Sequence, residues 1–416
     1  METEFVEGYQ DGQPASEGLG PQEDRKENLT AAPASHLEEQ KESVGSSPAE
    51  DAKFDRAKGS VIGALCGDAI GAVLEFCTGE ITEERAEEAL EMRGGGVFRV
   101  GPGQITDDGE LTMSLLHALV EGKGKFDEDE VARYYGKWKN SRPFDCGITI
   151  GNALSVADPK APDPLDIKEE ARGYNQKSQS NGSLMRSTPL AVFCHNMKIP
   201  NTKDSVTPSF NSEDWQGHRD CVFEAVKLDT TFTHPNETVH YVGGLYIYMI
   251  TLIINGVPLG EVYQTIIDDI EKSADEKYKD IISGWVRESE VDEVGSLDKQ
   301  MGWMKHAFVC CLRCLRLAAQ KQESNEELNS RFYEEAMVGI LMGKGDTDTN
   351  ACIAGGVIGA ILGFDKLPEV PKDKVLNWDN NKDEGHERDE FLVPKDQVLD
   401  LIEKLYSYGP KDLEVV

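Results

Sequence analysis

A long apolar stretch near the start of the chain, residues 57–76, carries glycines at a regular four-residue spacing. Side chains four residues apart lie on one face of an α-helix, so Gly63, Gly67 and Gly71 would leave that face bare. A bare face lets a second backbone approach closely. The stretch therefore predicts a buried helix in close contact with another helix, and not a phosphate-binding loop.

Helical patterns recur through the rest of the chain, and strands do not alternate with helices. The only β-like run is short, around residues 97–100. A doubly wound sheet is therefore excluded. We expect an all-α fold, a compact orthogonal bundle of about ten or more helices. Beyond the first helix, the predicted helices cover residues 110–120, 128–139, 183–193, 220–228, 237–254, 259–272, 301–319, 325–342 and 349–362.

The chain divides into three parts by composition. Residues 1–52 are rich in Glu, Ser, Gly and Pro and lack apolar periodicity, which is typical of a disordered acidic leader. The helical patterns occupy residues 53–365. Residues 366–416 form a charged extension with a short amphipathic helix predicted over 396–406. Polar or charged insertions are expected at residues 157–179, 198–216 and 273–300, the last with a short helix of its own.

Charge and hydropathy exclude some classes of partner. The formal net charge of −33 disfavours direct binding to nucleic acid or anionic membranes, because phosphate contacts need patches of Lys and Arg. The most apolar stretch, residues 239–254, contains His240, two glycines and three tyrosines. It falls short of the roughly 18 to 20 apolar residues of a membrane span, and we predict a buried core helix. The oligomeric state stays open.

The nine cysteines favour a reducing compartment. Their number is odd, and the acidic start Met1-Glu2-Thr3-Glu4 is not a secretory signal, so we expect a cytoplasmic or nuclear protein. Cys311-x-x-Cys314 beside Cys310 has the spacing of a metal or redox pair. A second such pair is missing and the surroundings are helical, so we predict packing instead.

The first candidate for chemistry is the segment 103–108, which ends in Thr106-Asp107-Asp108 just before a predicted helix. Thr and Asp are preferred N-cap residues. Capping accounts for one acidic residue, but not for a hydroxyl and two adjacent carboxylates. A helix cap and a ligand cluster both stay open for this segment alone.

The second candidate is Asp346-Thr347-Asp348-Thr349, between a glycine turn and an apolar, glycine-rich helix. Buried carboxylates become neutral unless a cation compensates them. Oxygen ligands without a nearby His or Cys pair favour Mg²⁺, Mn²⁺ or Ca²⁺ over zinc. The two acidic segments together carry enough charge for two divalent ions.

Weaker signals lie elsewhere. Glu75, close to the end of the first helix, is either a metal ligand or a surface residue. Segment 180–186, Ser-Asn-Gly-Ser-Leu-Met-Arg, is predicted to lead into a helix whose N–H groups and dipole suit a phosphate, although Ser-Asn-Gly is also an ordinary turn. Asp145 and His234, taken singly, are typical of turns or caps.

Together and in this order, the segments resemble the ADP-ribosylglycohydrolase family, all-helical enzymes that include dinitrogenase-reductase-activating glycohydrolase. The resemblance spans about residues 54–365. One motif would be unspecific, whereas the ordered set is specific. The matching pieces are Gly67-Asp68-Ala69-Ile70-Gly71 with Glu75-Phe76, Gly103-Gln104-Ile105-Thr106-Asp107-Asp108, Asp145-Cys146-Gly147, Asn181-Gly182-Ser183-Leu184-Met185-Arg186, Thr233-His234, and Gly345-Asp346-Thr347-Asp348-Thr349 with Ala354-Gly355-Gly356.

The resemblance implies a binuclear site for two Mg²⁺ or Mn²⁺ ions. Glu75 would lie beside the metals, as a ligand or as a residue exchanged when substrate binds. Asp145 matches a family aspartate that acts as a base or orients the ribose. The positions that match metal ligands are Thr106, Asp107, Asp108, Asp346, Asp348 and Thr349.

The resemblance also implies where ADP-ribose binds. The loop around Asn181 would hold its diphosphate, and His234 would lie near the phosphate or the ribose. The residues expected to bind substrate are Ser180, Asn181, Gly182, Ser183, Met185 and His234.

The expected reaction is hydrolysis of the N- or O-glycosidic bond between ADP-ribose and a modified protein side chain or small conjugate. Carboxylates would stabilise the oxocarbenium-like charge at the ribose, and two metals would orient the ribose and the attacking water. Asp107, Asp145 and Glu75 are all candidates for the base. The leaving group (arginine, serine, acetate or ADP-ribose) stays open, since Gly109-Glu110 departs from the pattern of many relatives.

Two other functions remain as alternatives. A catalytically silent member of the family would bind ADP-ribose or serve a structural role, but the intact acidic segments argue against it. A Ca²⁺-binding helical protein is the third interpretation, and it lacks the Asp-x-Asp-x-Asp-Gly loop of an EF-hand.

Overall fold

The computed structural model describes residues 47–198, 215–272 and 276–416, so most of the predicted leader lies outside the described residues. The first helix, α1 (Pro48–Gly71), starts earlier than predicted. Ser47 caps it by accepting a hydrogen bond from the N–H of Glu50 at 3.3 Å. Residues 48–52, assigned above to the leader, form the first turns of this helix.

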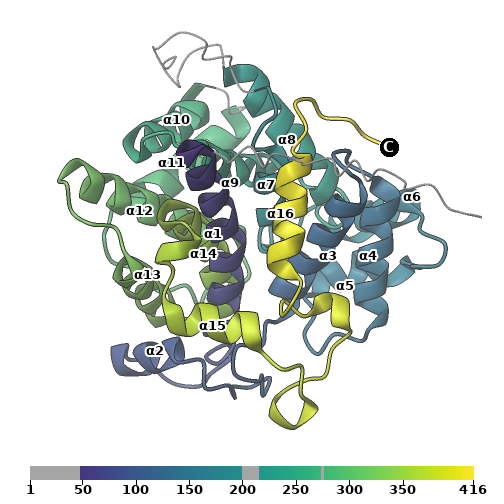
Figure 1. Ribbon diagram of the computed structural model, residues 1–416, viewed down its shortest axis with the longest axis horizontal. Coiled ribbons are helices and arrows are strands. Elements are labelled where there is room, and N and C mark those ends of the chain that lie inside the picture. Colours follow the sequence, from purple (N-terminus) through teal and green to yellow (C-terminus); the bar gives the residue numbers. More distant parts are fainter. Residues whose placement is uncertain (1–46, 199–214, 273–275) are drawn as a thin grey trace, which may run out of the picture. The chain divides into compact units, whose positions relative to one another are not determined.

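The described residues form helices with no strand among them, which confirms the all-α prediction (Figure 1). The β-like run at 97–100 lies in a tight turn closed by an isolated bridge between Gly95 and Val100. After α1, the α-helices are α2 (Glu83–Leu90), α3 (Asp107–Glu121), α4 (Glu128–Asn140), α5 (Ile148–Ala153), α6 (Pro164–Asn175), α7 (Thr188–Cys194), α8 (Gln216–Thr230), α9 (Glu237–Ile254), α10 (Leu259–Lys272), α11 (Glu276–Ser289), α12 (Met304–Glu323), α13 (Ser330–Met342), α14 (Thr347–Leu362), α15 (Glu369–Asn377) and α16 (Val398–Tyr408).

Helices α1 and α14 lie side by side and make the most extensive helix–helix contact in the described part of the chain (Figure 1). Glycines from both helices meet backbone to backbone. A Cβ atom on Gly67 would lie 2.1 Å from the carbonyl oxygen of Ala351, and one on Gly359 would lie 2.0 Å from that of Gly59. The bare helix face predicted from sequence is thus the α1–α14 contact, which leaves no room for any side chain.

Helix α9 fills the centre of the core. It is long and apolar enough to cross a membrane by length and composition, but 83% of it is buried inside the protein. It contacts α1, α7, α8, α10, α12 and α14. The prediction of a buried core helix is confirmed. Cys310, Cys311 and Cys314 are likewise buried in α12, as expected for packing.

Two predicted segments have a different structure, or more structure, than expected, and a third contains the helix predicted for it. The helix predicted over 183–193 begins only at Thr188, because Pro189 lacks an N–H and favours the first turn of a helix. The insertion at 157–179 contains α6, and the segment at 273–300 contains the predicted helix, α11. Of the insertion at 198–216, residues 199–214 lie outside the described residues.

The C-terminal extension is part of the main body of the protein. Helices α15 and α16, at the yellow end of the chain in Figure 1, pack against α1, and α16 also contacts α3 and α7. Contacts join residues 46–416 into one compact unit. Helix α16 buries its apolar face on helices that precede it, and the domain boundary at residue 365 stays a prediction.

Replacing Gly359 by alanine is expected to destabilise the fold by about 2 kcal/mol or more, because the added Cβ collides with backbone and cannot be relieved by a rotamer change. Urea unfolding followed by circular dichroism measures the change. Gly173→Ala is the matched control, since a Cβ there meets nothing within 4 Å on α6, and it should stabilise slightly. Equal stability of the two variants would contradict the role given to the α1–α14 contact.

Candidate metal centre and active site

The end of α1 meets the start of α14, and this junction brings distant carboxylates together. A Cβ atom on Gly71 would lie 2.3 Å from the Cα of Asp348, so the two helix ends touch. Asp68 lies in the last turn of α1, and Glu75 follows that helix. Asp346 is the N-cap residue of α14. The close packing of two helices therefore places acidic residues from both ends of the sequence side by side.

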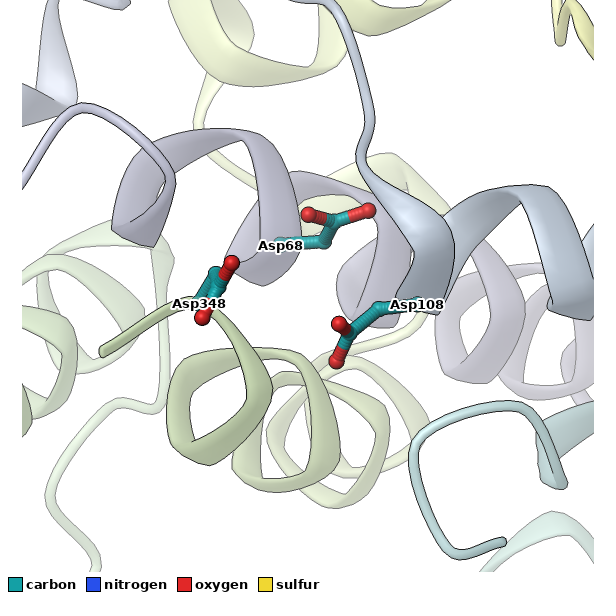
Figure 2. A group of neighbouring side chains, drawn as sticks. All are labelled: Asp68, Asp108 and Asp348. Atoms are coloured by element: carbon teal, nitrogen blue, oxygen red, sulfur yellow. The ribbon is translucent and has the colours of Figure 1, made fainter. Parts of the chain in front are cut away.

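Two groups of carboxylates are close enough to hold a cation each. Asp68, Asp108 and Asp348 form one group, and Glu75, Asp346 and Asp348 form the other, with the oxygens of each group within 4.8 Å of one another. Figure 2 shows the first group, in which α1, α3 and α14 each contribute one side chain to a common point. Asp348 belongs to both groups, so the two candidate positions adjoin.

Asp68 fixes the start of α3 and was missed in the sequence analysis. It accepts hydrogen bonds from the N–H of Thr106 at 2.9 Å, from the Thr106 hydroxyl at 2.8 Å and from the N–H of Gly109 at 2.9 Å. Thr106 itself makes no capping hydrogen bond, so the cap interpretation does not apply to its side chain. The available signal was a single carboxylate inside an otherwise apolar helix.

Burial raises the pKa of five carboxyl groups in and beside this cluster. The pKa of Asp68 rises to about 7 by burial, although hydrogen bonds from Thr106 oppose the shift. Burial, together with the charges of Asp346 and Asp145, raises the pKa of Glu75 to about 8. Burial and neighbouring carboxylates raise the pKa values of Asp107, Asp108 and Asp348 well above the ordinary value.

Two buried oxygens of the cluster point to a cation. Glu75 Oε2 and Asp108 Oδ1 have no hydrogen-bond partner among the described residues, although each is shielded from solvent. Thr349 donates its hydroxyl hydrogen to Asp108 Oδ2 at 3.3 Å, and the Thr106 hydroxyl, which donates to Asp68, lies 3.4 Å from the same oxygen; Oδ1 is left free. Uncompensated carboxylate oxygens in a buried site are costly, and divalent cations with oxygen ligands remove that cost. The residues present thus fit Mg²⁺ or Mn²⁺.

A cavity of about 380 Å³ opens over the cluster. Most of the predicted site residues line it, while Thr106 and Asp108 lie buried beneath its floor. Ile148 and Met301 also line the cavity, and neither was predicted from sequence as a site residue. The predicted residues in the wall are Glu75, Asp107, Asp145, Ser180, Asn181, Gly182, Met185, Asp346, Asp348 and Thr349.

Two residues expected to bind substrate lie behind the cavity wall. Ser183 and His234 are fully buried and do not line the cavity. His234 Nε2 lies 2.8 Å from Ser180 Oγ, and Nδ1 lies 2.8 Å from Thr233 Oγ1. Burial, aided by the charge of Arg186, lowers the pKa of His234 well below its ordinary value, so the ring is neutral. His234 orients Ser180 in this structure.

The loop of Ser180 to Met185 is held by contacts other than a helix start. Because α7 begins at Thr188, the predicted helix dipole behind Asn181 is absent. The N–H of Asn181 instead donates to the carbonyl of Gly302 at 3.0 Å, and its side-chain amide donates to Asp346 at 2.8 Å. Asn181 thereby links the loop to the carboxylate cluster, a long-range contact that the sequence does not show.

Asp145 and Asp107 meet at the edge of the cavity. Both residues line the cavity, and the N–H of Gly147, two residues after Asp145, donates to Asp107 at 3.3 Å. Burial raises the pKa of each carboxyl group, and the charge of Asp145 adds to the shift of Asp107. Two neighbouring buried carboxyl groups disfavour full ionisation of both.

These features define a class of protein: an all-α fold in which three helices present buried carboxylates for divalent cations beneath a cavity. Comparison with known proteins gives the family. The sequence model for ADP-ribosylglycohydrolase matches residues 49–411, so the chain belongs to the ADP-ribosylglycohydrolase family. The match includes α15 and most of the C-terminal extension.

Individual relatives agree with the family assignment. A candidate ADP-ribosyl glycohydrolase of Acanthamoeba polyphaga mimivirus is 30% identical over 331 residues, which cover 77% of this chain and 91% of that protein. The ADP-ribosyl-[dinitrogen reductase] glycohydrolase of Rhodospirillum rubrum is 36% identical over 143 residues, covering 33% of this chain and 44% of that protein.

A solved structure described as an ADP-ribosylglycohydrolase-related protein complex shares the fold. It has a TM-score of 0.58 and 20% identity, covering 86% of this chain and 99% of that one. The family and its named members are hydrolases of ADP-ribosyl conjugates, and this chain is a hydrolase of that type. The family is metal-dependent, and the carboxylate groups described above could hold the ions.

Chelation with EDTA is expected to lower the melting temperature, and more at about pH 8 than at about pH 5.5. The folded-state pKa values of Asp68, about 7, and Glu75, about 8, exceed their unfolded values. These groups therefore stabilise the metal-free protein at low pH, and their contribution is lost as the pH rises through these values.

Differential scanning fluorimetry before and after chelation measures the effect, expected to be about 5 °C or more at the higher pH. Readdition of Mn²⁺ should restore the melting temperature. A protein whose melting temperature is the same with and without EDTA at both pH values would contradict an assembled metal centre.

Asp68→Asn is expected to weaken Mn²⁺ binding by about 10-fold or more, because it removes one carboxylate and one acceptor that holds the start of α3. Isothermal titration calorimetry measures the affinity. Asp127→Asn is the matched control, since Asp127 also accepts N–H groups at a helix start, on α4, and belongs to neither carboxylate group. Equal Mn²⁺ affinity of the two variants would remove Asp68 from the centre.

Proposed function

We propose that the protein uses two divalent ions, Mg²⁺ or Mn²⁺, to hydrolyse the N- or O-glycosidic bond between ADP-ribose and a modified side chain or small conjugate. The observation that carries the proposal is the pair of carboxylate groups that share Asp348 beneath one cavity. Bound there, the ions would supply charge that orients the ribose hydroxyls and lowers the pKa of the attacking water.

The residues that line the cavity have three proposed tasks, which are to hold the ions, to transfer a proton and to bind the diphosphate. Asp348 and its neighbours in the two carboxylate groups hold the ions. Asp145 and Asp107 face the same space, and a raised pKa suits a group that must take a proton from water and return it. Glu75 has an unpartnered oxygen in the cavity wall and is the third candidate for that task.

The loop with Ser180 and Asn181 is the proposed contact for the diphosphate of ADP-ribose. Ser180 has a hydroxyl at the wall whose orientation is set by neutral His234 and by Thr149, at 3.1 Å. Asn181 is tied to Asp346 and so connects phosphate binding with the metal ligands. Polar groups beside bound cations would favour an anionic group and disfavour a neutral sugar alone.

The intact cluster also decides against the non-catalytic alternative. A protein that only bound ADP-ribose would gain nothing from several carboxylates whose pKa values are raised by burial, because ADP-ribose is itself an anion. The relatives named above are hydrolases, which supports the same choice. The leaving group is the part of the substrate that the cavity residues do not determine.

Incubation with Mn²⁺ or Mg²⁺ and peptides ADP-ribosylated on arginine or on serine is expected to release ADP-ribose, detected by mass spectrometry. Asp348→Asn should reduce the rate by about 1000-fold or more, since Asp348 serves both carboxylate groups. Asp400→Asn, an exposed position on α16, is the control and should match the wild type. Binding of ADP-ribose without release from any conjugate would support the non-catalytic alternative instead.

A further inference from the structure

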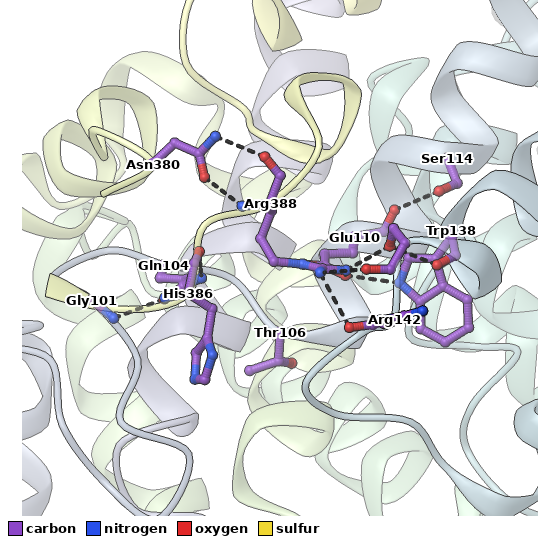
Figure 3. A network of polar contacts seen from close by, with 12 residues as sticks. Gly101, Gln104, Thr106, Glu110, Ser114, Trp138, Arg142, Asn380, His386 and Arg388 are labelled. Carbon is purple, nitrogen blue, oxygen red and sulfur yellow. Dashed lines mark hydrogen bonds and ion pairs between the residues drawn. The ribbon is translucent and has the colours of Figure 1, made fainter. Parts of the chain in front are cut away.

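The segment between α15 and α16, residues 378–392, lies over the loops that lead to the acidic residues, and we call it the C-terminal strap. Figure 3 shows its contacts with the start of α3 and with the loop after α4. The sequence predicted only a charged stretch here. The strap is closed on itself by Asn380, whose side-chain amide donates to the carbonyl of Arg388 at 2.8 Å and accepts from its N–H at 2.7 Å.

Arg388 forms a forked ion pair with Glu110, a residue in the first turn of α3. Its Nε lies 2.6 Å from Glu110 Oε1, and one terminal nitrogen lies 3.0 Å from Oε2. Trp138 donates its indole N–H to the same carboxylate at 2.8 Å. Glu110 is 1% exposed, so both of its oxygens are satisfied inside the protein by these two residues.

The same guanidinium reaches the loop that carries Asp145. It donates to the carbonyl of Ser141 at 3.1 Å and to the Ser141 hydroxyl at 2.7 Å. It also donates to the carbonyl of Arg142 at 3.4 Å. Arg388 thus connects the start of α3, which carries Asp107, with the loop that carries Asp145. Both carboxyl groups line the cavity.

His386 contacts the loop of Asp145 again and also holds the segment between α2 and α3. Its ring stacks on Phe144, the neighbour of Asp145, with centroids 4.1 Å apart and planes at 10°. Its Nε2 lies 2.7 Å from the carbonyl of Phe98. Its backbone exchanges two hydrogen bonds with the side chain of Gln104, at 2.8 and 3.0 Å, just before the acidic segment of α3.

We propose that the C-terminal strap sets the geometry of the metal centre, and that Arg388 is a positioning residue for Asp107, Asp108 and Asp145. This proposal rests on the proposed function for its catalytic readout, but not for its effect on metal binding. Arg388 touches none of the reacting groups. It acts through Glu110 on one side and through the loop of Ser141 on the other.

The negative charge of Glu110 explains why an arginine side chain lies at this position. Glu110 adds one more carboxylate to a helix start that already presents Asp107 and Asp108. A buried carboxylate without a partner would repel those neighbours and pull the helix start out of place. Arg388 compensates Glu110 and fixes its direction, because a planar guanidinium binds both carboxylate oxygens at once. The negative charge of the remaining residues then serves the metal ions.

The test is Mn²⁺ binding to the chelated full-length protein, measured by isothermal titration calorimetry, together with kcat and KM for release of ADP-ribose. Arg388→Ala is expected to weaken Mn²⁺ binding by about 10-fold or more and to lower kcat, with KM changed by less than about threefold. Arg388→Lys keeps the charge but not the fork, so it should fold and show the same change to a smaller extent.

The matched control is Arg219→Ala, which removes another forked ion pair, with Asp269 between α8 and α10, away from the strap. It should lower stability while leaving Mn²⁺ affinity and kcat within about twofold of the wild type. Wild-type Mn²⁺ affinity in Arg388→Ala, or in Arg388→Lys if the alanine variant does not fold, would overturn the proposal. If the wild type releases no ADP-ribose, calorimetry still decides, since it needs no substrate.

Discussion

The backbone contact between α1 and α14 is the constraint on which the rest of the structure depends. With glycines at the contact points, the two helices approach until carbonyl oxygens fill the space that side chains would take. That approach fixes the rotation and the register of each helix, because one step along either helix would bring a side chain into the interface. Asp68 and Asp348 then face one another as a consequence of packing.

A site assembled in this way concentrates negative charge inside the protein. Directed donors, such as the N–H groups and hydroxyl around Asp68, stabilise part of that charge. The carboxylate groups could hold cations that compensate the rest. Burial raises the pKa values of the carboxyl groups. It would also strengthen their attraction for bound cations, because electrostatic interactions are stronger where water is excluded. Without metal, the buried charges lower the stability of the protein. The same charges favour metal binding, because a bound cation removes that cost.

The fold was predictable from sequence to the extent that it depends on local patterns. Apolar periodicity gave α9 and α14, and the glycine spacing of α1 indicated a close helix contact, although not its partner. The two acidic segments were recognised because each gathers several ligands in a few consecutive residues. Ser180 and Asn181 were placed in the cavity wall through family resemblance, but for the wrong local reason, since Pro189 delays the helix expected behind them.

What escaped prediction depends on contacts between distant residues. Asp68 is a lone carboxylate in an apolar helix, and only the packing of α3 against α1 makes it part of the cluster. His234 appeared to be a binding residue, yet its ring is turned toward Ser180 in the interior. The role of the segment around Arg388 was also invisible, because its partner Glu110 lies far away in the sequence and charged residues near a chain end usually face solvent.

The position of α14 has a consequence for the order of events during synthesis. Asp68 and Asp108 leave the ribosome long before Asp348, so no nascent chain can complete the cluster until α14 has emerged and docked on α1. Contacts between such distant segments form slowly, because a long loop must close before they yield any stabilisation. Until α14 docks, the glycine face of α1 is uncovered and the cluster lacks Asp348. The carboxylate cluster is therefore complete only after α14 has docked on α1.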